Sequence, residues 1–492
     1  MLNPDICDRA RLARDARFDG QFFIGVTSTG IYCRPICPVV PPKRQNVRYF
    51  PTAAAAAEAG FRPCLRCRPE CAPGTPAWNG TSTTVRRGLR LIASGALDEG
   101  GVEMLAERLG VTSRHLRRLF HKHLGASPLA VAHTQRLHFA KRLIDDTHLP
   151  MSHIAIAAGY GSVRRFNDAF LKTYGRSPRE LRRARRSNGA RPAGNGAALT
   201  FRLPFREPFD WHALLAFFRP RATPGVEHVD GNSYRRVVSV DGRHGVLEVA
   251  PAEKAGFLVL TLHGARTESL FELIQRTRDV FDLDAPVAEI MDVLSRDPVL
   301  RRALDAHPGI RVPGAWSGFE LTVRAVLGQQ VSVKAATTLA GRVAARYGEP
   351  LALAADVPAA QGLTHAFPSP ERLRRARFNG IGMVQSRADT IRRVAAAVLA
   401  GDLRFDGTQD ADTLCRALCS IRGIGDWTAQ YVAMRALRYP DAWPAGDLGL
   451  QKALDPPRRV PAAELAARAE QWRPWRAYAA MLLWSSLPGG GG

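Results

Sequence analysis

The stretch SIRGIGDWTAQYVAMRAL (residues 420–437) contains two helical patterns joined by the short segment RGIGD (422–426). The glycines in this segment predict a tight hairpin that needs positive φ angles. The second helix is expected to begin at Trp427, so the hairpin's backbone N–H groups point outward, which suits a DNA phosphate. About 22 residues after Gly425, the segment WPAGDLGLQKAL places Asp447 on a loop just before another helix. Asp447 is therefore either a helix N-cap or a functional carboxylate.

The length and the charge of the chain point to several domains and a polyanionic partner. It has 492 residues, of which 46% are hydrophobic, enough for several packed cores. Its formal net charge is +24, from 69 Lys and Arg residues against 45 Asp and Glu. Because arginine can bind a phosphate through two parallel hydrogen bonds, this charge favours nucleic acid. An arginine-rich proteome is the alternative explanation of the same charge.

Four cysteines are spaced as two short pairs, Cys33-x3-Cys37 and Cys64-x2-Cys67, with 26 residues between the pairs. Residues 1–19 are charged rather than apolar, so we expect no secretory signal and no disulfides. No run of about 20 apolar residues occurs, so no membrane span is expected either. Two such pairs can place four thiolates at the corners of a tetrahedron, which predicts one Zn²⁺ site. The remaining cysteines are expected to be free thiols (Cys7 and Cys71) or buried, inert thiols (Cys415 and Cys419).

The surroundings of the paired cysteines, TGIYCRPICP (29–38) and FRPCLRCRPE (61–70), resemble the N-terminal domain of Ada, the bacterial adaptive-response protein. In that family the first cysteine of this element is a zinc ligand and also accepts a methyl group from a DNA methylphosphotriester. The resemblance therefore implies that Cys33 is the nucleophile. Zinc keeps a bound thiol deprotonated at neutral pH, so no general base is needed. The alternative is a purely structural zinc knuckle.

Methylation of such a site would also change its charge. Four thiolates on a divalent zinc ion carry a net charge of about −2, and conversion of one to a thioether leaves about −1. DNA phosphates would then be repelled less, so a methyl mark on Cys33 could tighten DNA binding. The side chains expected to contact phosphate are Arg34, Lys43, Arg44 and Arg48.

Residues 83–185 have a helical pattern with two similar helix-turn-helix units, VEMLAERLGVTSRHLRRLFHKHLG and MSHIAIAAGYGSVRRFNDAFLKTYGRSP. In the first, the turn is expected at Gly110 with Thr112 or Ser113 as the N-cap; in the second, Ser162 is the expected cap. This tandem arrangement resembles the AraC-type DNA-binding domain, whose paired units read successive turns of one duplex face. The side chains expected to face DNA, about half of them at phosphates, are Arg114, His115, Arg117, Arg118, Arg164, Arg165 and Asn167. The expected core residues are Leu116, Leu119, Phe166 and Phe170.

The rest of the chain divides into segments that differ in composition and in hydrophobic pattern. The segment 186–198 is basic and rich in Gly, Asn, Pro and Ala, so a flexible linker is expected. Strand-like runs followed by a helix predict a small α+β domain over residues 199–285, and the pattern from Pro286 onward is almost wholly helical. The fold expected is multidomain and mainly α: a zinc-bound α+β domain (1–76), a tandem helix-turn-helix domain (83–185), the linker (186–198), an α+β domain (199–285) and an all-α helix-hairpin-helix domain (286–492).

A helix-hairpin-helix followed by such an aspartate is typical of a DNA glycosylase superfamily, and residues 199–487 resemble its AlkA branch, the 3-methyladenine DNA glycosylases. Besides the hairpin and WPAGD, the shared elements are PFDW (208–211), FELTVRAVLGQQVSV (319–333) and QWRPWRAYAAMLLW (471–484). Gln330 occupies the position of the residue that wedges into the duplex in this family, where the family pattern has an aliphatic side chain. The roles that the resemblance implies are catalysis for Asp447, the pocket of the flipped base for Trp427, Tyr431 and Trp484, and DNA contact for Gln330, Gly423 and Gly425.

These residue types suit the chemistry of alkylated purines. N3- or N7-alkylated purines are cations with a weakened glycosidic bond, and an electron-rich aromatic pocket favours a cationic ring. A carboxylate near the sugar can stabilise an oxocarbenium-like transition state or orient the attacking water, and the sequence leaves both roles open. Bifunctional relatives carry a Schiff-base lysine where this chain has Trp427, so no lyase step is expected. No cysteine follows Cys419, which argues against an iron–sulfur cluster, and Trp472 and Trp475 are expected in the core.

Together the resemblances imply a bifunctional alkylation-damage response protein that accepts methyl groups, binds a promoter and excises alkylated purines. Ada continues into an O6-methylguanine methyltransferase domain with the element PCHR, which this chain lacks, so that activity is expected to be absent. The alternative is a methylation-activated transcription regulator whose glycosylase half is secondary or inactive. We expect double-stranded DNA and RNA polymerase as partners, one zinc ion, a monomer, and a cytoplasmic, nucleoid-associated location.

Overall fold

The structure, a computed structural model, divides into two compact units, Met1–Arg206 with Arg266–Gln275 and Glu207–Ala265 with Arg276–Gly492. Most of the predicted linker, residues 188–197, lies outside the described residues; residues 186 and 187 end a helix and residue 198 begins a strand. The described residues are 3–73, 83–98, 100–187, 198–240, 242–253, 256–264, 269–352, 357–454 and 458–487.

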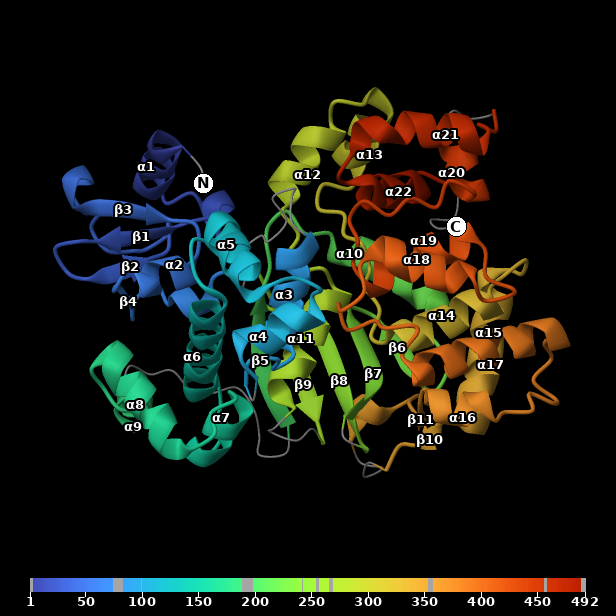
Figure 1. Cartoon of the computed structure of the whole chain (residues 1–492), viewed down its shortest axis with the longest axis horizontal. Coiled ribbons are helices and arrows are strands. Elements are labelled where there is room, and N and C mark those ends of the chain that lie inside the picture. The colour runs from blue at the N-terminus through green and yellow to red at the C-terminus, as the bar shows by residue number, and fades with distance from the viewer. Residues whose placement is uncertain are drawn as a thin grey trace. The chain divides into compact units, whose positions relative to one another are not determined.

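The N-terminal part of the first unit contains a small sheet, β1 to β4 (Figure 1). The paired cysteines lie at the end of one of its strands and in the loops that follow. Strand β1 (Phe23–Val26) pairs antiparallel with β2 (Ile31–Cys33) on one side and with β3 (Val47–Phe50) on the other. Strand β4 (Arg62–Pro63) pairs parallel with β2 and brings the second cysteine pair beside the first. The other elements of this part are α1 (Pro4–Ala13), η1 (Ala16–Phe18), η2 (Arg44–Asn46), α2 (Ala53–Glu58) and η3 (Pro69–Cys71).

Helices then continue the first unit, and they contain both predicted helix-turn-helix motifs. Thr112 caps the second helix of the first motif by accepting a hydrogen bond from the His115 N–H at 3.2 Å, and Ser162 does the same for Arg165. Gly110 has a φ of +71°, so the predicted turn is confirmed. The elements are α3 (Thr83–Ala93), α4 (Val102–Arg108), α5 (Ser113–Leu124), α6 (Pro128–Asp146), α7 (Met151–Ala157), α8 (Val163–Tyr174), α9 (Pro178–Ser187) and β5 (Ala198–Pro204).

The apolar face of each motif packs as the helical periodicity predicts. Leu116, Phe166 and Phe170 are fully buried, which confirms them as core residues, whereas Leu119 is only partly buried. Hydrophobic side chains from Phe23 through Ala132 form one continuous core. The cysteine-bearing sheet and the first helix-turn-helix motif therefore share an interior.

Polar contacts reinforce this shared core around helix α6. The Tyr32 hydroxyl, next to a cysteine, lies 2.8 Å from Nε2 of His138 on α6. The Arg68 guanidinium, next to another cysteine, lies 2.8 Å from a carboxylate oxygen of Asp145, which also accepts from Lys141 at 2.6 Å. Buried charges are retained when they are paired in this way, so the cysteine loops are anchored to the long helix between the two motifs.

The second unit contains strands that pair antiparallel in sequence order, from β6 (Glu227–Asp230) through β7 (Ser233–Val240) and β8 (Arg243–Pro251) to β9 (Phe257–His263). Burial alternates along β9, as a sheet covered on one face requires. The remaining elements between residues 207 and 306 are α10 (Trp211–Phe218), η4 (Arg219–Arg221), α11 (Leu270–Val280), α12 (Val287–Leu294) and α13 (Pro298–Ala306). The division between the units falls within α11, whose residues up to Gln275 belong to the first unit.

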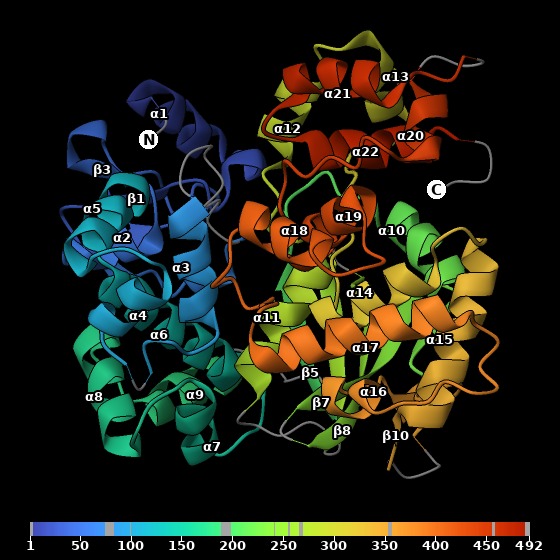
Figure 2. The ribbon, with the colours of Figure 1, turned by 45° about the vertical axis from the view of Figure 1, so that its right-hand side comes forward.

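The region after Pro286 is mainly helical, as predicted, apart from a short ladder between β10 (Glu349–Pro350) and β11 (His365–Ala366). Helix α14 (Gly318–Leu327) is buried along most of its length and lies between α17 and α19 (Figure 2). The other elements are α15 (Val333–Tyr347), η5 (Pro358–Ala360), α16 (Pro370–Arg374), α17 (Gln385–Ala400), α18 (Ala411–Cys419), α19 (Asp426–Ala436), α20 (Leu448–Ala453), α21 (Ala462–Ala469), η6 (Glu470–Trp472) and α22 (Arg476–Ser485).

Buried ion pairs join the sheet to helix α14 inside the second unit. Arg236 of β7 contacts Glu320 of α14 at 2.9 Å, and Arg324 of α14 contacts Glu227 of β6 at 2.7 Å. The Tyr234 hydroxyl donates to Glu227 at 2.6 Å. Burial on its own raises the pKa of Glu227, but the guanidinium groups of Arg324 and Arg236 outweigh it and lower the pKa to about 2.

This shift predicts an acid-sensitive component of stability. A carboxyl group with a depressed pKa in the folded state stabilises the fold above its unfolded pKa, and that stability is lost as the pH falls toward the folded pKa. Between about pH 5 and about pH 3 the Glu227 contribution should fall by about 2 kcal/mol. Urea unfolding followed by tryptophan fluorescence measures it, since seven of the eight tryptophans lie between residues 211 and 484.

The Glu227→Gln variant is the control for this measurement because other acidic groups titrate in the same range. Its free energy of unfolding should depend less steeply on pH than that of the wild type. Equal pH dependence of the two proteins would contradict the role assigned to Glu227.

Candidate functional site

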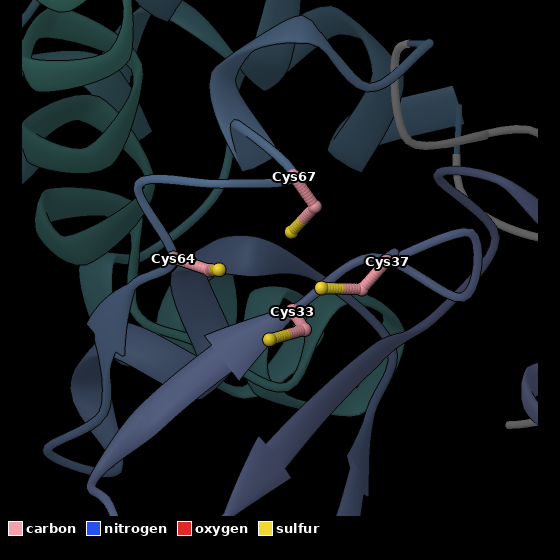
Figure 3. Close-up of side chains that lie close together, drawn as sticks. All are labelled: Cys33, Cys37, Cys64 and Cys67. Atoms are coloured by element: carbon pink, nitrogen blue, oxygen red, sulfur yellow. The ribbon is translucent and has the colours of Figure 1, made fainter. Parts of the chain in front are cut away.

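The paired cysteines converge on one point in the first unit (Figure 3). Cys33 ends strand β2, Cys37 follows in the next loop, and Cys64 and Cys67 lie in the loop after β4. Their Sγ atoms all lie within 4.8 Å of one another. A tetrahedral zinc ion with bonds of about 2.3 Å needs sulfur atoms about 3.8 Å apart, so the arrangement fits a closed four-thiolate site.

Hydrogen bonds from Arg34 brace this cluster. Its backbone N–H donates to Cys67 Sγ at 3.4 Å, and its guanidinium donates to the Cys67 carbonyl at 3.1 Å and to Asp19 at 2.8 Å. Arg34 is only 8% exposed. The sequence placed Arg34 at a DNA phosphate; instead it is buried, because the carboxylate of Asp19 compensates its charge.

The ionisation of the clustered thiols depends on a cation. Contact with the Cys37 and Cys64 thiols raises the pKa of Cys33 above its usual value, and contacts with its three neighbours raise the pKa of Cys67. The contact with Cys33 lowers the pKa of Cys37 and of Cys64, so without a metal the four thiols do not ionise together. Thiolates this close repel one another, so a bound metal ion is what would keep all four ionised.

The other cysteines do not join this cluster. Cys7 is buried and Cys71 is partly buried, and both are free thiols as predicted. Burial of Cys415 and Cys419 is contradicted: Cys419 is exposed and Cys415 is only partly buried.

The remaining basic residues predicted near DNA lie on the surface of the first unit. Lys43, Arg44 and Arg48 are exposed, and the Arg44 guanidinium also lies 3.4 Å from Asp8. In α5, Arg117 pairs with Glu103 at 2.9 Å and Arg118 lies 3.1 Å from the His115 ring. The exposed members of the two predicted recognition helices are Arg114, Arg117, Arg118, Arg164 and Arg165, whereas His115 and Asn167 are partly buried.

Asp447 is the centre of the second site. It is the N-cap of α20, where Oδ1 accepts from the Leu450 N–H at 2.9 Å. The indole N–H of Trp484 also donates to Oδ1 at 2.9 Å, and that of Trp427 donates to Oδ2 at 2.8 Å. Three helices thus hold one carboxylate that is 9% exposed. The N-cap and the functional carboxylate are therefore not exclusive interpretations.

Aromatic rings line one side of this carboxylate. The Trp427 and Tyr431 rings stack with centroids 5.3 Å apart and planes 7° from parallel. Burial on its own raises the pKa of Tyr431, but the guanidinium groups of Arg435 and Arg221 outweigh it and lower that pKa below its usual value. Arg435 donates to the Tyr431 hydroxyl at 2.6 Å and so fixes the ring. Arg435 could not be identified from the sequence, because the backbone carbonyls to which it also donates, those of Pro313 and Gly314, lie 122 and 121 positions away.

A second residue that sequence reasoning missed is Gly449. A Cβ atom at this position would lie only 2.9 Å from Asp447 Oδ1, so a larger residue would push against the carboxylate. The signal was present in the segment WPAGDLGL, where a glycine two residues after an aspartate opens a helix. The predicted core residues Trp472 and Trp475 are both buried, which confirms that prediction.

The hairpin before α19 has the predicted shape with one difference. Gly423 has a φ of +101°, and a Cβ there would lie 2.2 Å from Thr390 Oγ1, so glycine is required. Gly425 has a φ of −102° and caps α19, so it does not need glycine's freedom, contrary to the prediction. Gln330 is exposed in the loop after α14 with a φ of +56°.

Family models match successive parts of the chain. They are the metal-binding domain of Ada (residues 6–70), a helix-turn-helix domain (105–184), the AlkA N-terminal domain (200–317) and the HhH-GPD superfamily of base excision DNA repair proteins (323–476). Among the described residues, no helix is long and apolar enough to cross a membrane.

Two known proteins are similar to this chain in sequence, and a solved structure is similar to part of it in fold. The "Probable bifunctional transcriptional activator/DNA repair enzyme AlkA" of Mycobacterium tuberculosis is 41% identical over 98% of this chain and 96% of its own length. The Escherichia coli "DNA-3-methyladenine glycosylase 2" is 32% identical over 58% of this chain and 96% of its own length. The solved 3-methyladenine DNA glycosylase of Archaeoglobus fulgidus, 23% identical, covers 58% of this chain and 97% of its own with a TM-score of 0.51, which shows the fold.

The fold and the two sites therefore define a DNA-binding repair protein, in which an Ada-type zinc domain and a helix-turn-helix domain precede a helix-hairpin-helix DNA glycosylase domain. The four clustered cysteines are the ligands of its single zinc site. The chain belongs to the family of bifunctional transcriptional activator/DNA repair enzymes to which the mycobacterial relative belongs.

The cysteine cluster predicts the metal content of the protein. Purified wild type should contain about one zinc ion per chain, and Cys64→Ser should lose most of it because three thiolates leave the tetrahedron open. Cys415→Ser, outside the cluster, is the matched control and should keep its zinc. Elemental analysis by mass spectrometry measures the content, and full zinc occupancy in Cys64→Ser would show that the ligand set is wrong.

Proposed function

We propose that the second unit excises alkylated purines such as 3-methyladenine from DNA by hydrolysis of the N-glycosidic bond. The observation that supports this proposal best is the position of the Asp447 carboxylate. It accepts hydrogen bonds from the indole groups of Trp427 and Trp484, and Trp427 stacks on Tyr431. A carboxylate close to electron-rich aromatic rings suits a substrate whose base is a cation. The 32% identity to a 3-methyladenine DNA glycosylase supports the same substrate class.

The hydrogen bonds on Asp447 also favour one of the two roles that the sequence left open. Oδ1 accepts from both Trp484 and Leu450, so both of its acceptor positions are used. Oδ2 accepts from Trp427 and keeps one position. We propose that Oδ2 faces the sugar and stabilises the positive charge that develops there, rather than serving as a strong base.

The reaction then balances without an enzyme-bound intermediate. The bond between C1′ and the base nitrogen breaks, and its electron pair leaves with the base, which neutralises the alkylated purine. Water forms the new bond to C1′ and releases its proton to solvent. The hairpin position that carries a Schiff-base lysine in bifunctional relatives is Trp427, whose indole is bonded to Asp447, so we propose no lyase step.

Release of free 3-methyladenine from methylated duplex DNA tests this proposal. Asp447→Asn should lower the single-turnover rate about 10³-fold or more, since an amide carries no charge to stabilise the transition state. Asp210→Asn is the matched control, because Asp210 also caps a helix, α10, through an N–H bond at 2.8 Å. Full activity of Asp447→Asn would contradict the assignment, and a folded wild type that releases nothing would favour the regulator alternative.

We further propose that the first unit accepts a methyl group from DNA methylphosphotriesters on Cys33. Zinc, when bound, would supply the positive charge that keeps the thiol ionised. The sulfur of Cys33 forms a bond to the methyl carbon, the bond from that carbon to the phosphate oxygen breaks, and the oxygen keeps the electron pair as a phosphodiester anion. The choice of Cys33 rests on the resemblance to Ada, since Cys37 is the more exposed thiol.

Peptide mass spectrometry after incubation with methylated DNA tests the acceptor. We expect one added methyl group, and fragment ions should place it on Cys33. Cys33→Ala should lose methyl acceptance and damage-dependent promoter binding but retain base excision, because excision lies in the other unit. Cys71→Ala is the matched control with an unchanged cluster. Methyl groups on Cys37 instead, or loss of excision in Cys33→Ala, would overturn the proposal.

The exposed basic side chains of the first unit bear on its partners. We propose that the exposed arginines of α5 and α8 contact promoter DNA and that the methylated protein activates transcription through RNA polymerase. We also propose that it acts as a monomer in the cytoplasm at the nucleoid.

A further inference from the structure

A hydrogen-bond network connects the loop after α14 to the hairpin before α19. The side-chain amide of Gln329 donates to the Gly423 carbonyl at 2.9 Å and to Thr428 Oγ1 at 3.3 Å. These contacts join residues 94 and 99 positions apart in the chain. The backbone carbonyl of Gln329 in turn accepts from Arg387 of α17 at 2.6 Å.

Helix α17 supports the hairpin directly as well. Thr390 Oγ1 donates to the Arg422 carbonyl at 3.0 Å, and Arg393 donates to the same carbonyl at 3.4 Å. The carbonyls of Arg422 and Gly423 are thereby turned toward protein donors. The loop, α17 and the hairpin form one braced assembly, with α14 between α17 and α19 (Figure 2).

The braced loop presents an exposed tip. Gln330 is exposed and adopts a left-handed conformation with a φ of +56°, which non-glycine residues seldom adopt without support. Val331, the next residue, is an exposed apolar side chain at 38%. Exposed side chains of this kind on a rigid turn suit insertion between bases, whereas the hairpin suits a backbone phosphate.

We infer that Gln329 is a positioning residue for extrusion of the damaged nucleotide, an inference that rests on the proposed glycosylase function. Its amide fixes the separation between the inserting tip, Gln330 and Val331, and the phosphate-binding hairpin. If the tip could move relative to the phosphate-binding hairpin, the protein would bend and open the duplex less effectively. Gln329 contributes nothing to the bond-breaking step itself, which belongs to Asp447.

The test compares two duplexes, each with one N7-methylguanine, paired either with cytosine or with an abasic analogue. Extrusion costs less where the damaged base is unpaired, so that substrate should need the wedge less. Gln329→Glu has nearly the same shape but no donor for the Gly423 carbonyl. The single-turnover excision rate of Gln329→Glu should fall about 10-fold on the substrate paired with cytosine, because a hydrogen bond is lost and the carboxylate repels the Gly423 carbonyl. On the substrate opposite the abasic analogue the rate should change little.

Gln385→Ala is the matched control, because Gln385 makes an exposed amide bond to Asp389 at 3.0 Å on α17 outside the network. It should leave both rates unchanged. A loss of equal size on both substrates would show that Gln329 only maintains the fold, and an unchanged Gln329→Glu would show that it does not position the tip; either result overturns the inference. A wild type inactive on both substrates would instead defeat the proposed glycosylase function.

Discussion

The carboxylate of Asp447 is the constraint on which the second unit depends. A nearly buried carboxylate needs donors, and they come from the N-terminus of α20 and from indole groups of α19 and α22. The hairpin before α19 must therefore orient the Trp427 indole so that its N–H meets the carboxylate. Position 449 must be glycine-sized so that Asp447 Oδ1 can accept from the Leu450 N–H. The hairpin, the WPAGD segment and the C-terminal helix with Trp484 are separate motifs in the sequence, but all three supply hydrogen bonds to this one carboxylate or carry it.

The cysteine cluster imposes a comparable constraint on the first unit. Its ligands lie at the end of β2 and in the loops after β2 and β4. The side chains of Tyr32 and Arg68, next to two of the ligands, reach His138 and Asp145 on α6. Because α6 connects the two helix-turn-helix motifs, a change at the cysteines acts on an element that both motifs share. This continuity gives a physical basis for joining the proposed methyl acceptor to the helix-turn-helix domain.

Local patterns predicted most of this fold, and long-range contacts account for the misassignment of Arg34 and for the failure to find Gln329. Cysteine spacing, the caps Thr112 and Ser162, and the hairpin are set within a few residues, so the sequence was sufficient for them. Burial is decided by distant partners. Arg34 is internal because Asp19 pairs with it, and Gln329 could not be found because its partners lie more than ninety residues away. Gln330 was predicted as the inserting residue from family position; only the structure adds the exposed neighbour Val331.

Net charge alone was also an incomplete guide to the DNA-binding surface. Several arginines are buried or partly buried. Arg34, Arg68, Arg236 and Arg324 pair with buried carboxylates, whereas Arg435 donates to backbone carbonyls. An arginine paired with a carboxylate adds nothing to the net charge, so the pairs leave the formal excess of +24 for other residues. That excess must therefore be carried largely by unburied side chains, where phosphates can reach it and where salt screens it. Buried arginines therefore stabilise the structure around the two sites, whereas exposed arginines attract DNA.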